Sequence, residues 1–267
     1  MIFYSIDFSI SSDRLGAPFH ENIFADIKEA TARISSMSNE MDYIAVMAYN
    51  YEAIFNAIDN IAANGQLDFV DINACFSNFL NSCYTWKCYH NHLCREIFEK
   101  LQNKYRQKHI IYRLGEELRH YTTHKAIAIT RYVYDVLSET GSYQIDPQAI
   151  LELDTPNHKL NAQLKKWLKD KVEMNQRIDA LSVTKEYYKL CQEVQQELWS
   201  SYIQLIHKDL SAIFSTLPLT TTNIYNVSIV SDDQSVSFPM GQIVAQFLQK
   251  AAHQCPSFIL DSYVDKF

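Results

Sequence analysis

Hydrophobic residues recur every three to four positions along most of the chain, a spacing that places them on one face of an α-helix. One predicted helix begins near Asp71, a residue suited to an N-cap, and its apolar stripe consists of Ile72, Phe76, Phe79, Cys83, Trp86, Leu93 and Ile97. A second stripe predicts a helix over 105–138, with Leu114, Leu118, Tyr121, Ala128 and Tyr132 on one face. Similar patterns predict helices over 18–35, 39–63, 161–175, 184–215 and from Pro239 onward.

Alternation of apolar and polar residues, which is typical of β-strands, is confined to the two ends of the chain. Residues 1–17 predict a strand followed by a loop, and residues 223–230 with 235–238 predict a hairpin. We therefore expect a mainly α fold, with a helical bundle and an N-terminal strand and loop over 1–145. Residues 146–267 should form a helical extension with a small β-hairpin, either as a second domain or packed with the first.

The composition supports long helices, because tight turns and all-β folds need more than the 5 glycines and 6 prolines present. No window of about 18 apolar residues predicts a membrane span. Asp7 interrupts the apolar N-terminus and no basic segment precedes it, which is unlike a signal peptide. Four of the six cysteines fall in one predicted helix, a pattern that favours reduced thiols and a cytoplasmic protein.

The formal net charge of −7 argues against a surface that binds nucleic acid everywhere, yet the charge is unevenly distributed. Between residues 100 and 131, eight basic residues stand against two acidic ones, Glu116 and Glu117. A basic strip of this kind either directs a polyanion to one place or is an ordinary solvated helix face. Its members are Lys100, Lys104, Arg106, Lys108, Arg113, Arg119, Lys125 and Arg131.

Within this strip, residues 118–124 (LRHYTTH) place Arg119 and His124 five positions apart in a predicted helix. An arginine, a polar residue and then a histidine, late in a helical bundle, resemble the motif of the HEPN superfamily. Residues 78–83 (NFLNSC) and 112–118 (YRLGEEL) also look like bacterial members of that group. The resemblance covers about residues 39–138. His120 departs from the family pattern, in which asparagine is commoner at that position, but it retains a polar group.

The resemblance implies an endoribonuclease that needs no metal or other cofactor, of the kind that acts as a toxin or in antiviral defence. Arg119 would bind phosphate, His124 would transfer protons, and His120 would assist. Lys108, Arg113 and Lys125 are candidates for binding RNA. The resemblance further implies a homodimer and, for a toxin, an antitoxin-type protein partner. Some family members only bind nucleotides, so a non-catalytic module for dimerisation or for binding a nucleotide or protein is the alternative.

Residue chemistry fits this implied activity, since histidine exchanges protons near neutral pH and arginine holds two phosphate oxygens at once. Helix geometry adds a condition. At about 100° per residue, five steps leave Arg119 and His124 about 140° apart around a straight helix. They would not meet on one phosphate unless the helix distorts or a second chain supplies the complementary group.

Other interpretations of the same residues remain open. Arg119 could pair with Glu116 or lie over the core, and His124 could bond a carbonyl or carboxylate. Glu116, His120 and His124 share one helical face and could hold a divalent metal. Residues 88–94 (CYHNHLC) suggest zinc only weakly, because on a helix their cysteines and histidines divide between two faces, and we expect His90 to be structural. The sequence contains no P-loop, dinucleotide-binding glycine motif or nucleophile elbow.

Overall fold

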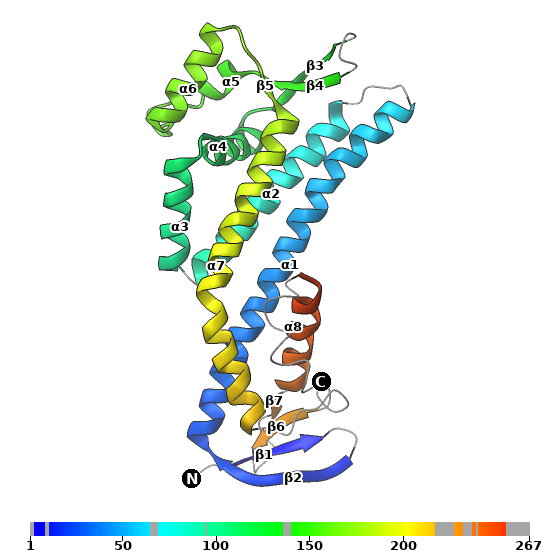
Figure 1. Ribbon diagram of the computed structural model, residues 1–267, viewed down its shortest axis with the longest axis vertical. Coiled ribbons are helices and arrows are strands. Elements are labelled where there is room, and N and C mark those ends of the chain that lie inside the picture. Colours follow the sequence, from blue (N-terminus) through cyan, green and yellow to red (C-terminus); the bar gives the residue numbers. More distant parts are fainter. Residues whose placement is uncertain are drawn as a thin grey trace. The chain divides into compact units, whose positions relative to one another are not determined.

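The computed structural model describes residues 3–8, 11–64, 69–93, 95–135, 140–216, 227–231, 237–238 and 240–254. The described chain is mainly helical with small antiparallel sheets, as the apolar spacing predicted (Figure 1). It divides into a terminal unit, residues 1–42 with 199–267, and a central unit, residues 43–198. The division falls inside the two longest helices, α1 (Glu21–Asn64) and α7 (Ala180–Thr216), and so differs from the expected boundary at residue 145.

The terminal unit combines a four-stranded sheet with helices. The strand order is β2-β1-β6-β7, in which β1 (Phe3–Phe8) pairs antiparallel with both β2 (Ser11–His20) and β6 (Val227–Ser231). The predicted hairpin is confirmed, because β6 pairs antiparallel with β7 (Ser237–Phe238). The predicted last helix is α8 (Met240–Gln254). Buried residues of α1, α7 and α8 form the apolar core, among them Ile34, Met41, Leu210, Ile213, Val244 and Phe247.

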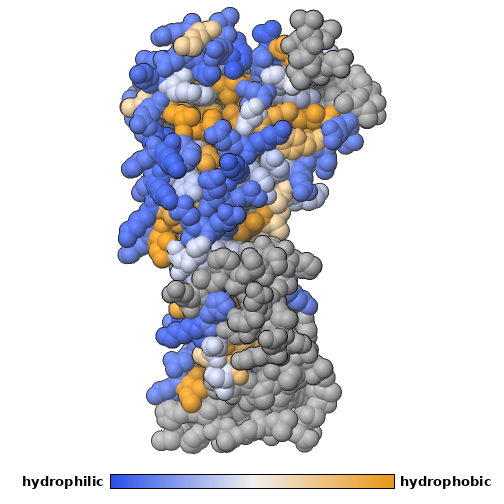
Figure 2. Space-filling view, viewed as in Figure 1, coloured by the Kyte–Doolittle hydropathy of each residue, from blue (hydrophilic) through white to orange (hydrophobic). Residues whose placement is uncertain are grey.

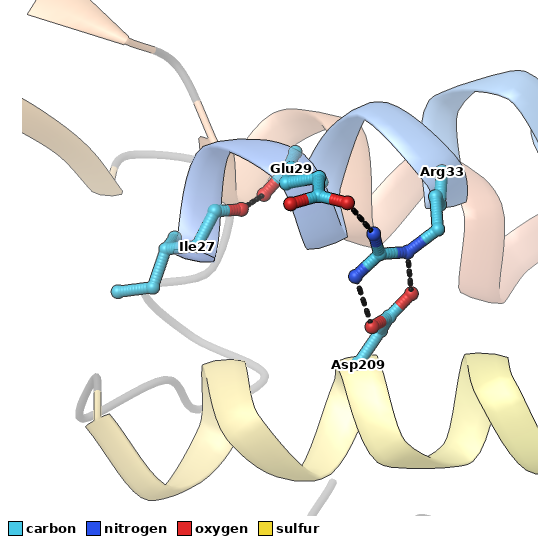
Figure 3. A network of polar contacts seen from close by, with 5 residues as sticks. Ile27, Glu29, Arg33 and Asp209 are labelled. Atoms are coloured by element: carbon cyan, nitrogen blue, oxygen red, sulfur yellow. Dashed lines mark hydrogen bonds and ion pairs between the residues drawn. The ribbon is translucent and has the colours of Figure 1, made fainter. Parts of the chain in front are cut away.

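A part-buried ion pair joins α1 to α7 inside the terminal unit (Figure 3). Arg33 donates from Nε and Nη2 to the two carboxylate oxygens of Asp209, each at 2.7 Å. Asp209 is only 3% exposed, and Glu29 accepts a further hydrogen bond from Arg33 at the exposed side. Such a two-pronged contact fixes the relative register of the two helices as well as neutralising the buried charge.

The central unit is built around three helices that contact one another through aromatic rings. Tyr51 of α1 stacks on Tyr188 of α7 with ring centroids 4.1 Å apart, and it lies 6.1 Å from Phe79 of α2 (Phe69–Leu93). The predicted stripe of α2 is confirmed from Ile72 to Trp86, whose members are at most 1% exposed. Trp86 donates from its indole nitrogen to Gln195 of α7 at 2.8 Å, so this buried polar atom is satisfied.

The remaining elements of the central unit follow α2 in sequence. These are α3 (Arg95–Lys108), α4 (Ile110–His124), β3 (Ile129–Asp135), β4 (Thr140–Ile145), α5 (Pro147–Leu151), α6 (Ala162–Glu173) and β5 (Ile178–Asp179). The three strands form an antiparallel sheet in the order β3-β4-β5. A buried asparagine ties this sheet to α2, since Asn73 bonds to both the amide and the carbonyl of Ile129.

The expected helix over 105–138 is wrong in two respects. His109 is extended and separates α3 from α4, and the chain leaves helical geometry after His124. Residues 129–135 instead form β3, which pairs with β4 and places the rings of Tyr132 and Tyr143 with centroids 4.8 Å apart. The segment (ITRYVYD) is rich in β-branched and aromatic residues, which favour strands once a partner strand covers them. Ile97, expected on the α2 stripe, lies on α3 and is 39% exposed.

The break expected between helices 18–35 and 39–63 does not occur, because α1 is continuous. Met37 and Met41 are buried, so the apolar stripe continues through residues 35–38 (SSMS), the serine-rich stretch between the two expected helices. Several expectations fall outside the described residues: Gly65 as a helix end, the hairpin turn at 232–234, Cys94, Cys255, and the side chains of His90, His92 and Leu93.

None of the helices that the structure describes is both long and apolar enough to cross a membrane. On the face drawn in Figure 2, hydrophilic side chains cover much of the described surface and hydrophobic areas interrupt them. Val70 and Ile127 of the central unit, 75% and 57% exposed, are two of the exposed hydrophobic residues.

Candidate functional site

Helix α4 carries the residues that the sequence motif singled out, and two of its faces line two different cavities of the central unit. Its buried side, which includes Leu114 and Leu118, packs into the core. Gly115 allows α7 to approach, because a Cβ at that position would lie 2.6 Å from the ring of Tyr187. The close packing of α4 on α7 fixes the position of the residues on the neighbouring turns of α4.

The first cavity, which we call the Arg119 pocket, has a volume of about 330 Å³ and contains Arg119 and His120. Five segments meet there: α2, α3, α4, the loop before α6, and α7. The lining residues are Leu80, Tyr84, Lys87, Cys88, Gln102, Arg106, Glu116, Glu117, Arg119, His120, His158 and Tyr187.

The second cavity, the His124 pocket, has a volume of about 620 Å³ and lies between α2 and the end of α4. It contains His124 and Lys125 beside the apolar side chains of Phe69, Val70 and Ile127. Of these two cavities among the described residues, Arg119 therefore lines one and His124 the other. This separation agrees with the angle calculated from helix geometry. His120 lines the Arg119 pocket, and its ring centroid lies 4.7 Å from that of His124.

Arg119 has a guanidinium without an ion-pair partner among the described residues. It stacks on the ring of Tyr84, with Cζ 3.7 Å from the ring centroid. Its Nε is buried and has no hydrogen-bond acceptor within the described part of the chain. The expected alternative, a pair between Arg119 and Glu116, is not formed. An unsatisfied buried donor costs about 1–3 kcal/mol, and the same side chain lines the cavity.

Glu116 instead neutralises two other cations at the base of the pocket. It accepts hydrogen bonds from Lys87 Nζ at 2.9 Å and from Nε and Nη2 of Arg106 at 2.9 Å. Burial alone would raise the pKa of Glu116, but the charges of Lys87 and Arg106 outweigh burial and lower it. Two cations on one carboxylate leave an excess positive charge, to which Arg119 adds.

Lys87 is itself buried, at 5% exposure, and is held by aromatic groups. Its ammonium lies 4.0 Å from the ring centroid of Tyr112 and donates a hydrogen bond to the hydroxyl of Tyr187 at 2.9 Å. Burial opposes the charge, but Tyr112, Tyr187 and Glu116 keep the pKa of Lys87 above its ordinary value. The lysine is therefore a fixed positive charge inside the pocket wall.

Two histidines stack in the same pocket. The rings of His120 and His158 are nearly parallel, at 7°, with centroids 4.2 Å apart. Burial lowers the pKa of His120, and the nearby charges of His158, His124 and Arg119 lower it further. His120 is consequently neutral at physiological pH and able to accept a proton.

The other predicted RNA-binding residues have separate positions. Arg113 is 8% exposed and donates to Asn161 and Gln163 at the start of α6, so it serves as an internal tie and not as a surface contact. Lys108 and Lys125 are exposed. Elsewhere in the basic strip, Lys104 pairs with Glu197 and Arg106 with Glu116, which reduces the charge available to a polyanion.

The described residues contain no group of three histidine, cysteine, aspartate or glutamate side chains arranged to hold a metal ion. Glu116, considered as a ligand together with His120 and His124, is bonded to Lys87 and Arg106. Cys83 and Cys88 are free thiols.

Arg106 and Glu117 were recognised from the sequence only as charges of the basic strip and not as parts of a site, and Lys87, His158 and Tyr187 of the same pocket were not predicted. Lys87 offered a signal, since it lies four residues after Cys83 on an otherwise apolar face of α2. His158 offered none, because it follows no periodic pattern and reaches the pocket only through the path of the loop between α5 and α6.

Comparisons with protein-family models, curated proteins and solved structures find no match to this chain. An assignment of function therefore rests on the chemistry of the pocket itself.

Proposed function

We propose that this protein binds the phosphate of RNA in the Arg119 pocket and cleaves the RNA there without a metal ion, as the HEPN-like motif implies. The observation that carries the proposal is the unpaired guanidinium of Arg119, whose buried Nε lacks an acceptor and which lies beside His120. Three permanent cations and two carboxylates line the pocket, a balance that favours an anionic ligand. A phosphate can accept two hydrogen bonds from one arginine.

The proposed reaction is an internal transfer within the RNA. A base removes the proton of the 2′-hydroxyl, O2′ attacks the adjacent phosphorus, and the bond from phosphorus to O5′ breaks. A proton is returned to O5′, so the products are a 2′,3′-cyclic phosphate and a free 5′-hydroxyl. Arg119 would stabilise the charge that accumulates on the phosphorane, and neutral His120 would accept the proton.

His124 lines the other cavity, so its proposed role differs from that of His120. We propose that it acts through a homodimer in which a second copy brings its His124 to the Arg119 pocket. Light scattering at tens of micromolar tests the oligomer. A strictly monomeric protein that still cleaves RNA would eliminate this role for His124.

A second candidate function is binding without cleavage, in which the same pocket holds a nucleotide. The separation of Arg119 from His124 favours it, because the two motif residues are not assembled within one chain. An antitoxin-type protein partner would belong to either function only if the protein acts as a toxin.

Cleavage of a labelled single-stranded RNA in EDTA separates these candidates. The wild-type protein should cleave it, and the products should carry cyclic phosphate ends. Arg119→Ala and His120→Ala should each reduce the rate by about 100-fold or more. Lys100→Ala, a change at an exposed residue of the basic strip outside both cavities, should retain the wild-type rate. Binding of RNA without cleavage by the wild-type protein would leave the second candidate.

A further inference from the structure

His158 belongs to the Arg119 pocket although it lies outside the motif and outside α4. The turn that carries it is fixed by two backbone hydrogen bonds with Thr155, of 2.8 and 3.2 Å. Asp154 accepts from the amide of Leu160 at 3.1 Å and closes the same loop. Arg113 holds the start of α6 against α4, which keeps the loop beside the pocket. The position of His158 is thus determined by several contacts rather than by a single one.

Glu117 fixes the orientation of the His158 ring. His158 Nε2 lies 2.7 Å from Glu117 Oε2, and the Glu117 side chain is only 18% exposed. An ionised Glu117 accepts a hydrogen bond from Nε2–H, which leaves Nδ1 to face other partners. Among the described residues, Nδ1 of His158 has no hydrogen-bond partner. When His158 is protonated, it pairs with Glu117 and Nδ1–H becomes a donor.

The stacked pair is suited to hold one proton at a time. Two charged imidazoles with ring centroids 4.2 Å apart would repel each other strongly. Cationic neighbours oppose a charge on His120, whereas the carboxylate of Glu117 lies against the His158 ring. The ionisable groups that surround the pair come from α2, α3, α4, the residue after α4, and α7: Tyr84, Lys87, Cys88, Arg106, Glu116, Glu117, Arg119, His124, Lys125 and Tyr187.

We propose that His158, oriented by Glu117, is the general acid of this pocket and returns the proton to O5′ while His120 acts as the base. The inference rests on the proposed ribonuclease function and adds a residue to it. One neutral and one protonated histidine are what the reaction needs, because one proton must be removed and another supplied. Arg119, His120 and His158 line the same cavity, so a single phosphate can reach all three. Glu117 acts through His158 as a positioning residue.

The leaving group provides the test. We would compare two substrates: an RNA dinucleotide, whose O5′ alkoxide needs a proton to leave, and uridine 3′-(4-nitrophenyl phosphate), whose nitrophenolate leaves without one. His158→Ala should slow cleavage of the dinucleotide by about 100-fold or more but slow the nitrophenyl ester by less than about tenfold. His120→Ala should slow both substrates equally. Glu117→Gln should slow cleavage of the dinucleotide more than that of the nitrophenyl ester, as His158→Ala does, but by a smaller factor. Asn157→Ala, at an exposed residue of the same loop, should cleave both substrates at the wild-type rate.

The possible outcomes are distinguishable. Suppose that wild type cleaves both substrates and that His158→Ala slows the two reactions by the same factor or slows neither. His158 is then not the general acid, while the proposed function stands. If wild type cleaves neither substrate, the proposed function and this inference are both wrong. Circular dichroism and thermal melting check that each variant folds. Should His158→Ala unfold, His158→Asn replaces it, because asparagine can retain the hydrogen bond to Glu117 but cannot serve as the acid.

Discussion

Glu116 and Glu117 are adjacent in α4, yet their surroundings shift the two carboxyl pKa values in opposite directions. For Glu117, burial raises the pKa and the contact with His158 only partly offsets this effect. For Glu116, Lys87 and Arg106 outweigh burial and lower the pKa. The charge of Glu116 therefore stabilises the folded protein, whereas burial disfavours the charge of Glu117 in the folded state.

We predict that Glu116→Gln lowers the free energy of unfolding by about 2–3 kcal/mol at pH 7, because it leaves the buried ammonium of Lys87 without its carboxylate. A lowered pKa contributes stability above the ordinary value of 4.5 that is lost as the pH falls through the lower value of the folded state. The difference from wild type should thus be full above pH 4.5 and shrink as the pH falls below it. Urea denaturation between pH 3 and pH 8 measures it.

Glu117→Gln is the matched control at the next position. Because burial raises the pKa of Glu117, its protonated form is favoured in the folded state and its contribution to stability is lost as the pH rises. Removing this charge should change stability at pH 7 by less than about 1 kcal/mol, in either direction. Equal destabilisation by the two substitutions would contradict the assignment of opposite electrostatic environments.

For individual site residues, the sequence predicted those that belong to the motif and did not predict their contacts with residues of other helices. Arg119 and His120 were named from their position in residues 118–124, and both line the pocket. Whether Arg119 pairs with Glu116 could not be predicted, since the outcome depends on Lys87 and Arg106 from other helices. Those contacts are set by tertiary packing, which spacing along one helix does not encode.

Among the elements, α2 and β3 illustrate what a sequence pattern determines. The stripe from Ile72 to Trp86 predicted α2 correctly, because the burial of one helical face is a local, periodic property. The apolar spacing of residues 129–135 suits both a helix and a strand, and the pairing of β3 with β4 decides for the strand. Strand pairing involves residues distant from the segment and so is hard to detect in one sequence.

The junction between α2 and β3 depends on Asn73, and we predict that Asn73→Ala destabilises the protein by about 2–4 kcal/mol. The substitution removes hydrogen bonds to the carbonyls of Phe69 and Ile129 and from the amide of Ile129, leaving buried backbone groups unpaired. Asn78→Ala, at an exposed position of the same helix, should cost less than about 0.5 kcal/mol. Chemical denaturation of both variants gives the comparison, and equal midpoints would refute the role of Asn73.

On the scale of the whole molecule, every residue that lines the Arg119 pocket belongs to the central unit. The sequence did not predict this division, because α1 and α7 contribute to both units and no glycine- or proline-rich linker marks a boundary. The expected boundary at residue 145 relied on Gly141 and Pro147, which instead lie in β4 and at the first turn of α5.

Because the pocket is lined by the central unit alone, we predict that its affinity for RNA does not depend on the stability of the terminal unit. Asp209→Asn should destabilise the terminal unit by about 1–3 kcal/mol, since it removes the buried carboxylate that accepts two hydrogen bonds from the part-buried Arg33 (Figure 3). Glu29→Gln, at the exposed partner of the same arginine, should cost less than about 1 kcal/mol. Neither substitution should alter the affinity of the pocket for RNA while the protein remains folded. A large loss of affinity in Asp209→Asn below its melting temperature would show that the site depends on both units.

The most direct test of the central claim is the affinity of the Arg119 pocket for an RNA phosphate, measured apart from cleavage. A fluorescein-labelled RNA with 2′-O-methyl groups lacks the nucleophile, so fluorescence anisotropy reports binding alone. We predict that wild type binds it and that Arg119→Gln weakens binding by about tenfold or more, which corresponds to about 1.4 kcal/mol for a charged hydrogen bond. Arg131→Gln, at an exposed arginine of the same basic strip, should change the affinity by no more than about twofold. Absence of binding by wild type at tens of micromolar, or equal affinity of wild type and Arg119→Gln, would contradict the account.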